Sequence, residues 1–520
     1  MAKNSSFRLA GIIGSATILS KVVALLRDQI IAYSFGTTAG ADAFNYAYKL
    51  PGFMLTLLGG VNGPFYSAVV SVIGRRKSQR VAPLMETLNT LTTVVMGVVA
   101  VGLWFGAPLL IGLVANKASL EIQQMAIAQL RIMAPMAVLS GLIGLGFGVL
   151  TTANKFALPS LSPILSSLAV IFAVLFFGHQ DANILAWGVL IGALLQWLVQ
   201  LPLQAKLGLG SLRLRWGWRN KAVKEFVSIS APAAGSSLLS NLNVYTDLFF
   251  ASQLRSGVPS ALGYANLLVQ APIGILSNIL LIPALPAFSR LANPKDWPEL
   301  RIKIRETILT VCIIVLPLSA LTVALAVPVV SAIYERGRFT PADSLMTAQV
   351  FAGSALGMVF YLSRDMLIRV FYALGEAKLP LRISLIGIGV NLALDWTFIQ
   401  FFGPAGLTLS TSGVSALACL LLIFALHKRL GRLGWAGLGG TLFNLLIGAI
   451  LTGLSAWGAY NLLSVVWPIT GIFPILLKLS AASTVGISVQ VLWILLWRNR
   501  EVGKLLSPLL RRIFRRGAKG

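Results

Sequence analysis

Long apolar runs are the feature that most constrains this chain. A membrane-spanning helix needs about 20 mostly apolar residues. Hydrophobic residues make up 57% of the 520 residues and charged residues only 11%, whereas soluble domains carry about 25% charged residues. Helices are expected because an open sheet cannot satisfy its backbone polar groups in lipid. We predict an all-α integral membrane protein with about fourteen transmembrane helices, near residues 11–34, 51–73, 89–115, 124–151, 157–178, 183–204, 227–253, 264–288, 306–333, 344–374, 381–402, 405–426, 436–463 and 471–497.

Basic residues alternate between the loops on the two sides of these runs. Of the 42 Lys and Arg residues, 31 lie in the loops on the side of the N-terminus, five in the opposite loops and the rest within spans. Cytoplasmic loops of membrane proteins are enriched in Lys and Arg, so we expect both termini in the cytoplasm. The net charge of +26 is therefore mainly a topology signal and not the mark of a nucleic-acid partner.

The second half of the chain weakly repeats the first. Tyr46-Ala47 and Pro51-Gly52 recur about 220 residues later as Tyr264-Ala265 and Pro272–Gly274. Repeated halves are typical of transporters. The longest cytoplasmic linker, 206–224, is predicted to be an interfacial amphipathic bridge. We predict an N-terminal six-helix lobe (1–215), a C-terminal six-helix lobe (216–432), two further transmembrane helices (433–500) and a basic cytoplasmic tail (501–520).

The first apolar run carries charges where hydrocarbon is expected. Lys21, Arg27 and Asp28 lie within or near the end of this run. A charge at the bilayer centre costs about 2.5–3.5 kcal/mol on insertion scales, so such residues normally face a bundle interior or a wet cavity. Lys21 and Arg27 project about 240° apart on a helix, and only a broad cavity would receive both. The alternative is that Arg27 and Asp28 lie near a helix end and extend to the interface.

A second polar group lies in later spans. Asn391 and Asp395 are four residues apart and share one helix face, and Asp247 and Thr411 occur in other apolar segments. An all-oxygen donor set suits a hard cation such as sodium. A buried carboxylate that carries a proton is the competing chemistry, and simple bridging between helices is the structural alternative.

Arg364, Asp365 and Arg369 form a third polar group. Arg364 and Asp365 are candidates for an internal ion pair, and Arg369 lies close to Glu376 on the cytoplasmic side. The alternative is an interfacial helix end with extended cationic side chains. From its polar span alone, we add Arg364 to the candidate substrate-binding residues.

No pattern in the chain favours an enzyme. The two cysteines, Cys312 and Cys419, lie in apolar runs and indicate neither a disulfide framework nor a metal site. His179 and His427 are far apart in sequence, and no nucleophile elbow, zinc-protease, phosphate-loop or dinucleotide motif is present. The extracytoplasmic loops are too short for a soluble catalytic domain. We expect no catalytic residues and no cofactor other than a sodium ion.

Several short motifs resemble the MurJ/MviN family of lipid II flippases, in the MOP exporter superfamily. They are SKVVALLRD at 20–28, FG at 35–36, ADAF at 41–44 and KLP at 49–51, followed by the Asn391/Asp395 pair and GLTLS at 406–410. The resemblance extends over nearly the whole chain, and it includes the number of predicted helices.

The resemblance implies a function and a set of site residues. The family flips an undecaprenyl-pyrophosphate-linked peptidoglycan precursor, lipid II, outward across the bacterial inner membrane by alternating access, for cell-wall synthesis. Lys21 and Arg27 match the basic positions that hold the pyrophosphate, and Asp42 matches an important acidic position at the extracytoplasmic mouth. The resemblance therefore makes Lys21, Arg27 and Asp42 candidate substrate-binding residues. The last two helices would form a groove for the lipid tail. The implied sodium ligands are Asp247, Asn391, Asp395, the carbonyl of Leu407 and Thr411.

The chain departs from the family pattern at three cationic positions. Leu55 and Leu267 stand where the family has arginines, and Lys21 replaces an arginine. Lysine is a point charge, whereas arginine offers a bidentate fork. These departures leave lipid II and another polyprenyl-linked saccharide both open as substrates.

Other classes of function are also open at this stage. A MATE-like cation-coupled exporter of small organic cations is the runner-up, although such a site favours acidic and aromatic residues over Lys21 and Arg27. A third hypothesis is a scaffold that binds cell-wall synthesis enzymes through the basic tail. Expected partners are lipid II, membrane lipids and such enzymes.

Overall fold

The computed structural model describes residues 2–60, 63–74, 81–177, 181–281, 284–376, 378–431, 438–469, 471–497 and 502–503. Side chains are not described for residues 2–18, 236, 238–240 and 438. The basic loop at 75–80, His179 and nearly all of the tail at 501–520, about which the sequence made predictions, therefore lie outside the described residues.

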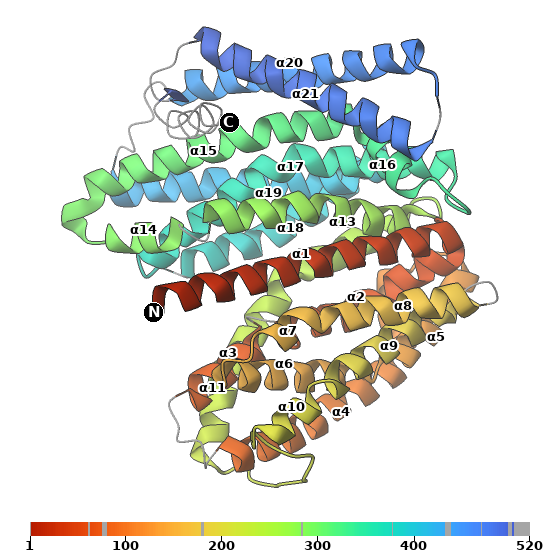
Figure 1. The fold of residues 1–520 in the computed structure, drawn as a ribbon, viewed down its shortest axis with the longest axis vertical. Helices are drawn as coiled ribbons and strands as arrows, with labels where there is room; N and C mark the ends of the chain where they lie inside the picture. The colour runs from red at the N-terminus through yellow and green to blue at the C-terminus, as the bar shows by residue number, and fades with distance from the viewer. Residues whose placement is uncertain are drawn as a thin grey trace. The chain divides into compact units, whose positions relative to one another are not determined.

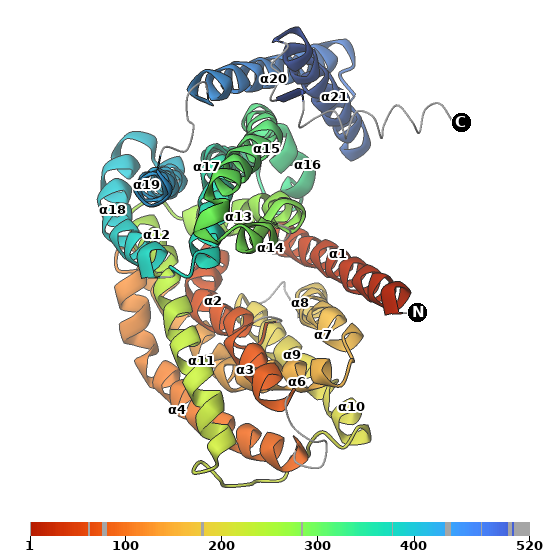
Figure 2. The ribbon, with the colours of Figure 1, turned by 90° about the vertical axis from the view of Figure 1, so that its left-hand side faces the viewer.

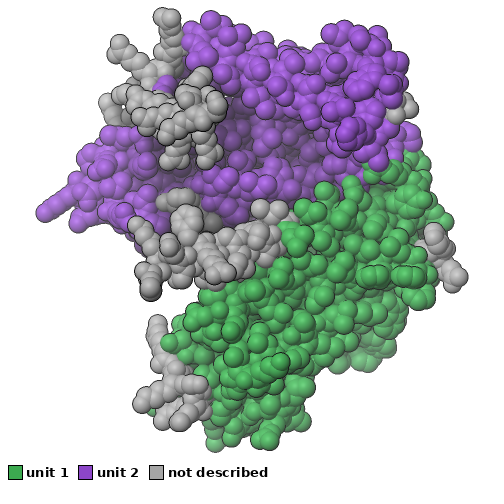
Figure 3. Space-filling model, in the orientation of Figure 1, with its two compact units in different colours: residues 1–260, 336–340 green, residues 261–335, 341–520 purple. Residues whose placement is uncertain are grey.

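The described chain is all-helical and divides into two compact units (Figure 1, Figure 3). Unit 1 is Met1–Ser260 with Arg336–Thr340, and unit 2 is Ala261–Glu335 with Pro341–Gly520. The helices of unit 1 are α1 (Ala2–Phe35), α2 (Ala39–Leu57), α3 (Pro64–Ile73), α4 (Val81–Val114), α5 (Leu120–Met133), α6 (Met136–Thr152), α7 (Ala157–Leu161), α8 (Pro163–Phe177), α9 (Asn183–Leu198), α10 (Leu201–Lys206), α11 (Lys221–Ser240) and α12 (Leu242–Ala251).

The boundary between the units falls inside α13 (Val258–Leu276). Unit 2 continues with the π-turn η2 (Ser277–Leu281), α14 (Ala284–Arg290), the short 3₁₀ helix η3 (Pro294–Asp296), α15 (Trp297–Ala324), α16 (Ala326–Tyr334), α17 (Pro341–Ala373), α18 (Lys378–Phe402), α19 (Pro404–Leu430), α20 (Leu438–Val466) and α21 (Ile472–Trp497).

Ten of the described helices or helix runs are long and apolar enough to cross a membrane, or eleven if the bent pair α5–α6 is one span. The bend of 41° in this pair occurs next to Pro135, which cannot donate a backbone hydrogen bond. Three further predicted spans coincide with α1, with α2 and α3, and with α11 and α12. The chain is therefore a multi-pass membrane protein, while the count of fourteen stays a prediction.

The core of unit 1 lies where α3, α4, α6 and α11 meet (Figure 2). Leu88 of α4, Val69 of α3 and Val149 of α6 are almost completely buried, and Phe65 and Phe226 meet edge to face. In contrast, the outer face of α4 exposes Val98, Phe105 and Leu109. Large exposed apolar side chains along a span are expected to face lipid.

In unit 2, α17 packs against α15 and α19, and α20 pairs with α21 (Figure 1). Polar groups join the last two helices. The Thr452 hydroxyl donates to Gln490 Oε1 at 3.0 Å, and the Trp493 indole N–H donates to the Asn444 carbonyl at 3.0 Å. Hydrogen bonds of this kind hold helices together in lipid, where the hydrophobic effect does not.

Candidate functional site

The cations of the first span lie on one continuous helix, α1. Arg27 is inside the helix, which continues to Phe35, and its side chain is half-buried. Its guanidinium contacts the carboxylate of Asp28 at 2.7 Å (Nη2–Oδ1) and 2.8 Å (Nε–Oδ1). Lys21 is exposed on the same helix. The structure thus places two cations on α1, one of them oriented by a neighbouring carboxylate.

Asp42 lies in the first turn of α2 and is almost completely buried. Its carboxylate accepts hydrogen bonds from Ser256 Oγ (3.1 Å), the Gly257 backbone N–H (2.5 Å), and the backbone N–H and hydroxyl of Ser260 (3.1 and 2.6 Å). These donors surround the N-terminus of α13, where free amides and the helix dipole favour a negative charge. In this conformation Asp42 holds a helix end in place.

Lys49 is a functional candidate that the sequence analysis missed. The sequence places it in an extracytoplasmic loop and ends the preceding segment at Pro51, but α2 runs through Pro51 to Leu57. An isolated proline is tolerated in a membrane helix because neighbouring groups satisfy the freed carbonyl. Lys49 is half-buried, and the charges that act on it are Asp247 of α12 and Asp28. Its spacing from Asp42, seven residues, is the signal that places both on one helix face.

Part of the predicted ion site comes together on α18 and α19. Asn391 and Asp395 are fully buried, and the Asn391 amide donates to Asp395 Oδ2 at 2.6 Å, which confirms that the two share a face. Ser410, which the sequence analysis did not single out, donates its hydroxyl to the other carboxylate oxygen of Asp395. The Leu407 carbonyl oxygen lies 2.8 Å from Ser410 Oγ and accepts a hydrogen bond from the Thr411 hydroxyl at 3.1 Å.

Asp247, the remaining predicted ligand, belongs to α12 in unit 1. In the part of the chain that the structure describes, no group of three or more His, Cys, Asp and Glu side chains could hold a metal ion. The oxygen donors around Asp395 are of a different kind. One carboxylate is accompanied there by amide, hydroxyl and carbonyl oxygens. This donor chemistry fits a hard cation and does not fit a transition metal.

Arg364 does not form the ion pair that the sequence suggests. Asp365 pairs with Arg369, one turn away on α17, at 3.4 Å, and Glu376 pairs with Arg429 at 2.8 Å. The i,i+4 spacing places Asp365 and Arg369 on one helix face, one turn apart. The Arg364 guanidinium lies over the Tyr361 ring, 4.9 Å from its centroid, and among the described residues its buried Nε has no hydrogen-bond partner. The Arg364 Nε–H is therefore a buried donor that an anion could satisfy.

The Phe35-Gly36 motif closes the first helix with a left-handed residue. Gly36 has φ of +56°, and a Cβ built on it would lie 2.5 Å from the Arg338 carbonyl oxygen. The Arg338 amide in turn donates to the Tyr33 carbonyl at 2.9 Å. Only glycine satisfies both the dihedral angle and this close approach.

We expect Gly36→Ala to lower the thermal unfolding midpoint more than Gly208→Ala does. Both glycines are left-handed, with φ of +56° and +62°, and a side chain costs about 1–2 kcal/mol in that region. A Cβ at Gly208 meets nothing within 4 Å, so only Gly36 adds a steric clash. Thermal unfolding of the two purified variants in the same detergent measures the difference, and equal shifts would contradict it.

Comparison with known proteins decides the family. A family model described as lipid II flippase MurJ matches residues 31–479. The chain belongs to the MurJ family. Flippases of this family are transporters and not enzymes.

The MurJ relatives match nearly the whole chain. A probable lipid II flippase MurJ from Synechocystis is 41% identical over 528 aligned residues, covering 99% of each protein. The lipid II flippase MurJ of Burkholderia cenocepacia is 29% identical, covering 88% of this chain and 90% of the relative.

Solved structures share the fold. MurJ in an inward closed conformation matches with a TM-score of 0.75 at 20% identity, covering 96% of this chain and 99% of that one. An inward-facing multidrug resistance MATE transporter of the MOP superfamily matches with a TM-score of 0.64 at 14% identity, covering 82% and 98%. The part of the chain that the structure describes is thus all-helical, with a fold shared by MurJ and MATE transporters.

Proposed function

We propose that this chain flips lipid II from the cytoplasmic to the outer leaflet of the bacterial inner membrane, for cell-wall synthesis. The observation that carries the proposal is a pair of cations on α1, Lys21 and Arg27, in a chain that matches the MurJ family model over residues 31–479. Their charge complements the pyrophosphate of the substrate. The Synechocystis relative, named a probable lipid II flippase, supports the same substrate.

The proposed headgroup site uses few cations. Arg27 supplies a guanidinium oriented by Asp28, and Lys21 supplies a flexible ammonium. Arg364, in unit 2, stays a separate candidate because its buried Nε has no hydrogen-bond partner among the described residues. Leu55 and Leu267, at family arginine positions, cannot contribute. Asp42 acts indirectly in this proposal, because its carboxylate is engaged by α13 and repels a pyrophosphate.

Alternating access between two six-helix lobes, 1–215 and 216–432, is the proposed mechanism. The helices within 433–500 would guide the lipid tail, and both termini would lie in the cytoplasm with the basic tail at 501–520. The bias of basic residues between the loops supports this orientation.

Sodium and the membrane potential are the proposed energy sources. Asp395, Asn391, the Leu407 carbonyl and Thr411, all in unit 2, would hold the ion, and their all-oxygen chemistry supports sodium. Asp247, in unit 1, stays a ligand implied by the family resemblance alone. Sodium can drive the cycle only if it binds one conformational state more tightly than the other.

We expect Asp395→Asn to remove the sodium dependence of flipping. Asparagine is close in size to aspartate but carries no charge, so it binds a cation far more weakly. Ser410→Ala is the matched control, because it removes one hydrogen bond to Asp395 and leaves the carboxylate. The measurement is flipping of fluorescent lipid II in vesicles with sodium or with choline outside. An Asp395→Asn response to sodium equal to that of the wild type would refute the ion site.

A MATE-like exporter of small organic cations is the second candidate, and the shared fold favours it. Against it stand the cations Lys21 and Arg27, which repel a cationic substrate. Rescue of a strain depleted of its own lipid II flippase separates the two functions. Rescue by the wild-type chain supports flipping of lipid II. Failure of a well-expressed chain would point to the exporter or to another polyprenyl-linked saccharide.

A further inference from the structure

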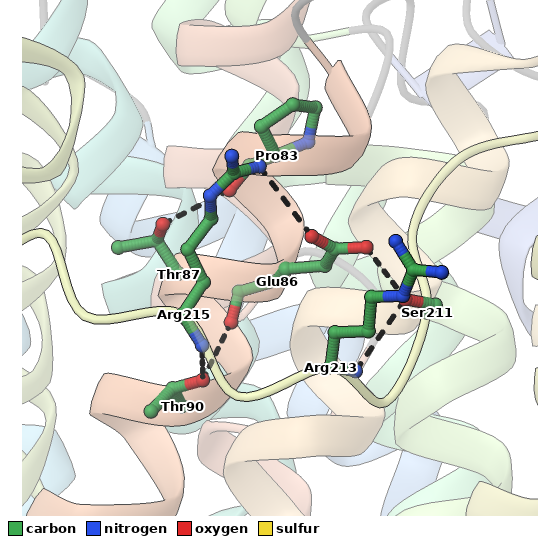
Figure 4. Close-up of polar contacts among 7 residues, drawn as sticks. All are labelled: Pro83, Glu86, Thr87, Thr90, Ser211, Arg213 and Arg215. Atoms are coloured by element: carbon green, nitrogen blue, oxygen red, sulfur yellow. Dashed lines mark hydrogen bonds and ion pairs between the residues drawn. The ribbon is translucent and has the colours of Figure 1, made fainter.

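The segment from Leu207 to Asn220, here called the strap, joins α10 to α11 without regular secondary structure. The strap is bonded to α4. Figure 4 shows it lying along the first turns of α4, with side chains and backbone bonded to that helix.

Glu86 and Thr90 of α4 hold the strap in place (Figure 4). The Ser211 hydroxyl donates to Glu86 Oε1 at 2.5 Å, and the Arg215 guanidinium lies 3.6 Å from Glu86 Oε2. The Arg215 backbone N–H donates to Thr90 Oγ1 at 3.0 Å. Gly217 approaches so closely that a Cβ on it would lie 3.2 Å from Thr87 Cγ2. The strap is thus fixed through its odd-numbered residues.

The even-numbered residues are apolar and exposed. Leu212, Leu214, Trp216 and Trp218 have exposed fractions of 64%, 88%, 67% and 65%. In an extended chain, successive side chains point to opposite sides, so fixing the odd residues on α4 turns the even ones outward. Leaving four large apolar side chains in water forgoes the favourable free energy of burying them, so an apolar partner for this face is expected.

The bilayer surface is the occupant that the position of this face favours. The candidate span Asn183–Lys206 ends where the strap begins, and Glu86 lies near the start of the candidate span Val81–Val114. A segment held between these two ends lies at a membrane surface. Tryptophan is enriched there because its ring is apolar and its N–H is polar.

The positive charge of the strap determines which lipids it binds. Exposed cations flank the apolar face on both sides, namely Lys206, Arg219, Lys221 and Lys224. Glu86, the carboxylate bonded to the strap, is already engaged by Ser211 and Arg215. Basic segments next to a membrane are attracted to anionic lipids by about 1 kcal/mol per Lys or Arg.

We propose that the strap is an interfacial anchor that binds anionic phospholipids of the cytoplasmic leaflet. Leu212, Leu214, Trp216 and Trp218 insert between the headgroups, and the flanking cations bind the phosphates. The assignment to the cytoplasmic leaflet rests on the orientation given under Proposed function. Lipid binding itself does not depend on what the chain transports.

Neighbouring strap positions provide the first test. Leu214→Cys and Arg213→Cys are labelled with the fluorophore NBD in the full chain, whose two native cysteines are buried. Each protein is reconstituted in phosphatidylcholine vesicles with and without phosphatidylglycerol. We expect NBD at 214 to be quenched by spin-labelled lipid and NBD at 213 by aqueous iodide, and phosphatidylglycerol to increase the lipid quenching at 214. Equal access of iodide to both positions would refute insertion and point to a soluble protein partner.

A matched pair of charge variants tests the lipid selectivity. Arg219→Gln removes a strap cation, and Lys117→Gln removes an exposed cation from a loop that the sequence assigns to the opposite membrane surface. Association of spin-labelled phosphatidylglycerol, relative to phosphatidylcholine, should fall about five-fold in the first variant, the equivalent of ~1 kcal/mol. It should stay unchanged in the second. Equal effects of the two variants would refute a specific anionic-lipid anchor.

Glu86→Gln tests whether α4 orients the strap. The amide keeps an acceptor for Ser211 but loses the ion pair with Arg215. We expect the difference in quenching between positions 213 and 214 to shrink in this background while the protein stays folded. An unchanged difference would show that the contacts with α4 do not set the orientation of the strap.

Discussion

Asp42→Asn should abolish complementation of a strain depleted of its lipid II flippase. The carboxylate accepts four hydrogen bonds from Ser256, Gly257 and Ser260. An asparagine side chain has one acceptor oxygen and turns an NH₂ group toward the remaining donors. Hydrogen bonds to charged groups contribute about 1.5–3 kcal/mol each, and buried donors left without acceptors add a further cost. We expect the N-terminus of α13 to lose its fixed position.

Complementation and thermal unfolding of the purified protein measure this effect. Ser256→Ala is the control, because it removes one 3.1 Å bond and leaves the three contacts with Gly257 and Ser260. It should complement and unfold close to the wild-type temperature. Full activity of Asp42→Asn would show that the contacts with α13 are dispensable.

Arg27→Ala should lower the rate of lipid II flipping by roughly 10- to 100-fold, the loss expected when a charge-assisted hydrogen bond of about 1.5–3 kcal/mol disappears. In the proposed site its guanidinium binds the pyrophosphate, and neither Leu55 nor Leu267 can replace it. Flipping of fluorescent lipid II in vesicles measures the rate.

Arg27→Ala also leaves the carboxylate of Asp28 without the guanidinium that lies 2.7 Å away. The double variant Arg27→Ala/Asp28→Asn separates the two effects because it removes the negative charge as well. We expect the double variant to stay inactive. Recovery of flipping would show that Arg27 only neutralises Asp28. As a further control, Arg131→Ala removes a cation that stacks on Trp104 at 5.0 Å and should leave flipping unchanged.

Two elements show how local sequence patterns predict local structure. The i,i+4 spacing of Asn391 and Asp395 predicts a shared face, and the structure confirms it with a hydrogen bond of 2.6 Å. The Phe35-Gly36 pair is a second local pattern of this kind, since its left-handed glycine ends the first helix. Both depend on residues close in the chain, whose relative positions follow from helix geometry.

Helix boundaries near proline are harder to predict from the sequence. The sequence ends a segment at Pro51, whereas α2 continues to Leu57 and brings Lys49 inside a helix. Proline disfavours a helix locally, but packing and the lack of water in lipid favour keeping the backbone helical.

The sequence alone determined the class of the protein, because apolar run length and the distribution of basic residues reflect the bilayer and not the details of packing. Only the tertiary structure decided the partners of the charged residues. It places Asp42 against Ser256, Gly257 and Ser260, more than 200 positions away. It also holds the strap on Glu86, 125 positions before Ser211. No local periodicity predicts such pairs, because packing of distant helices decides which polar groups meet.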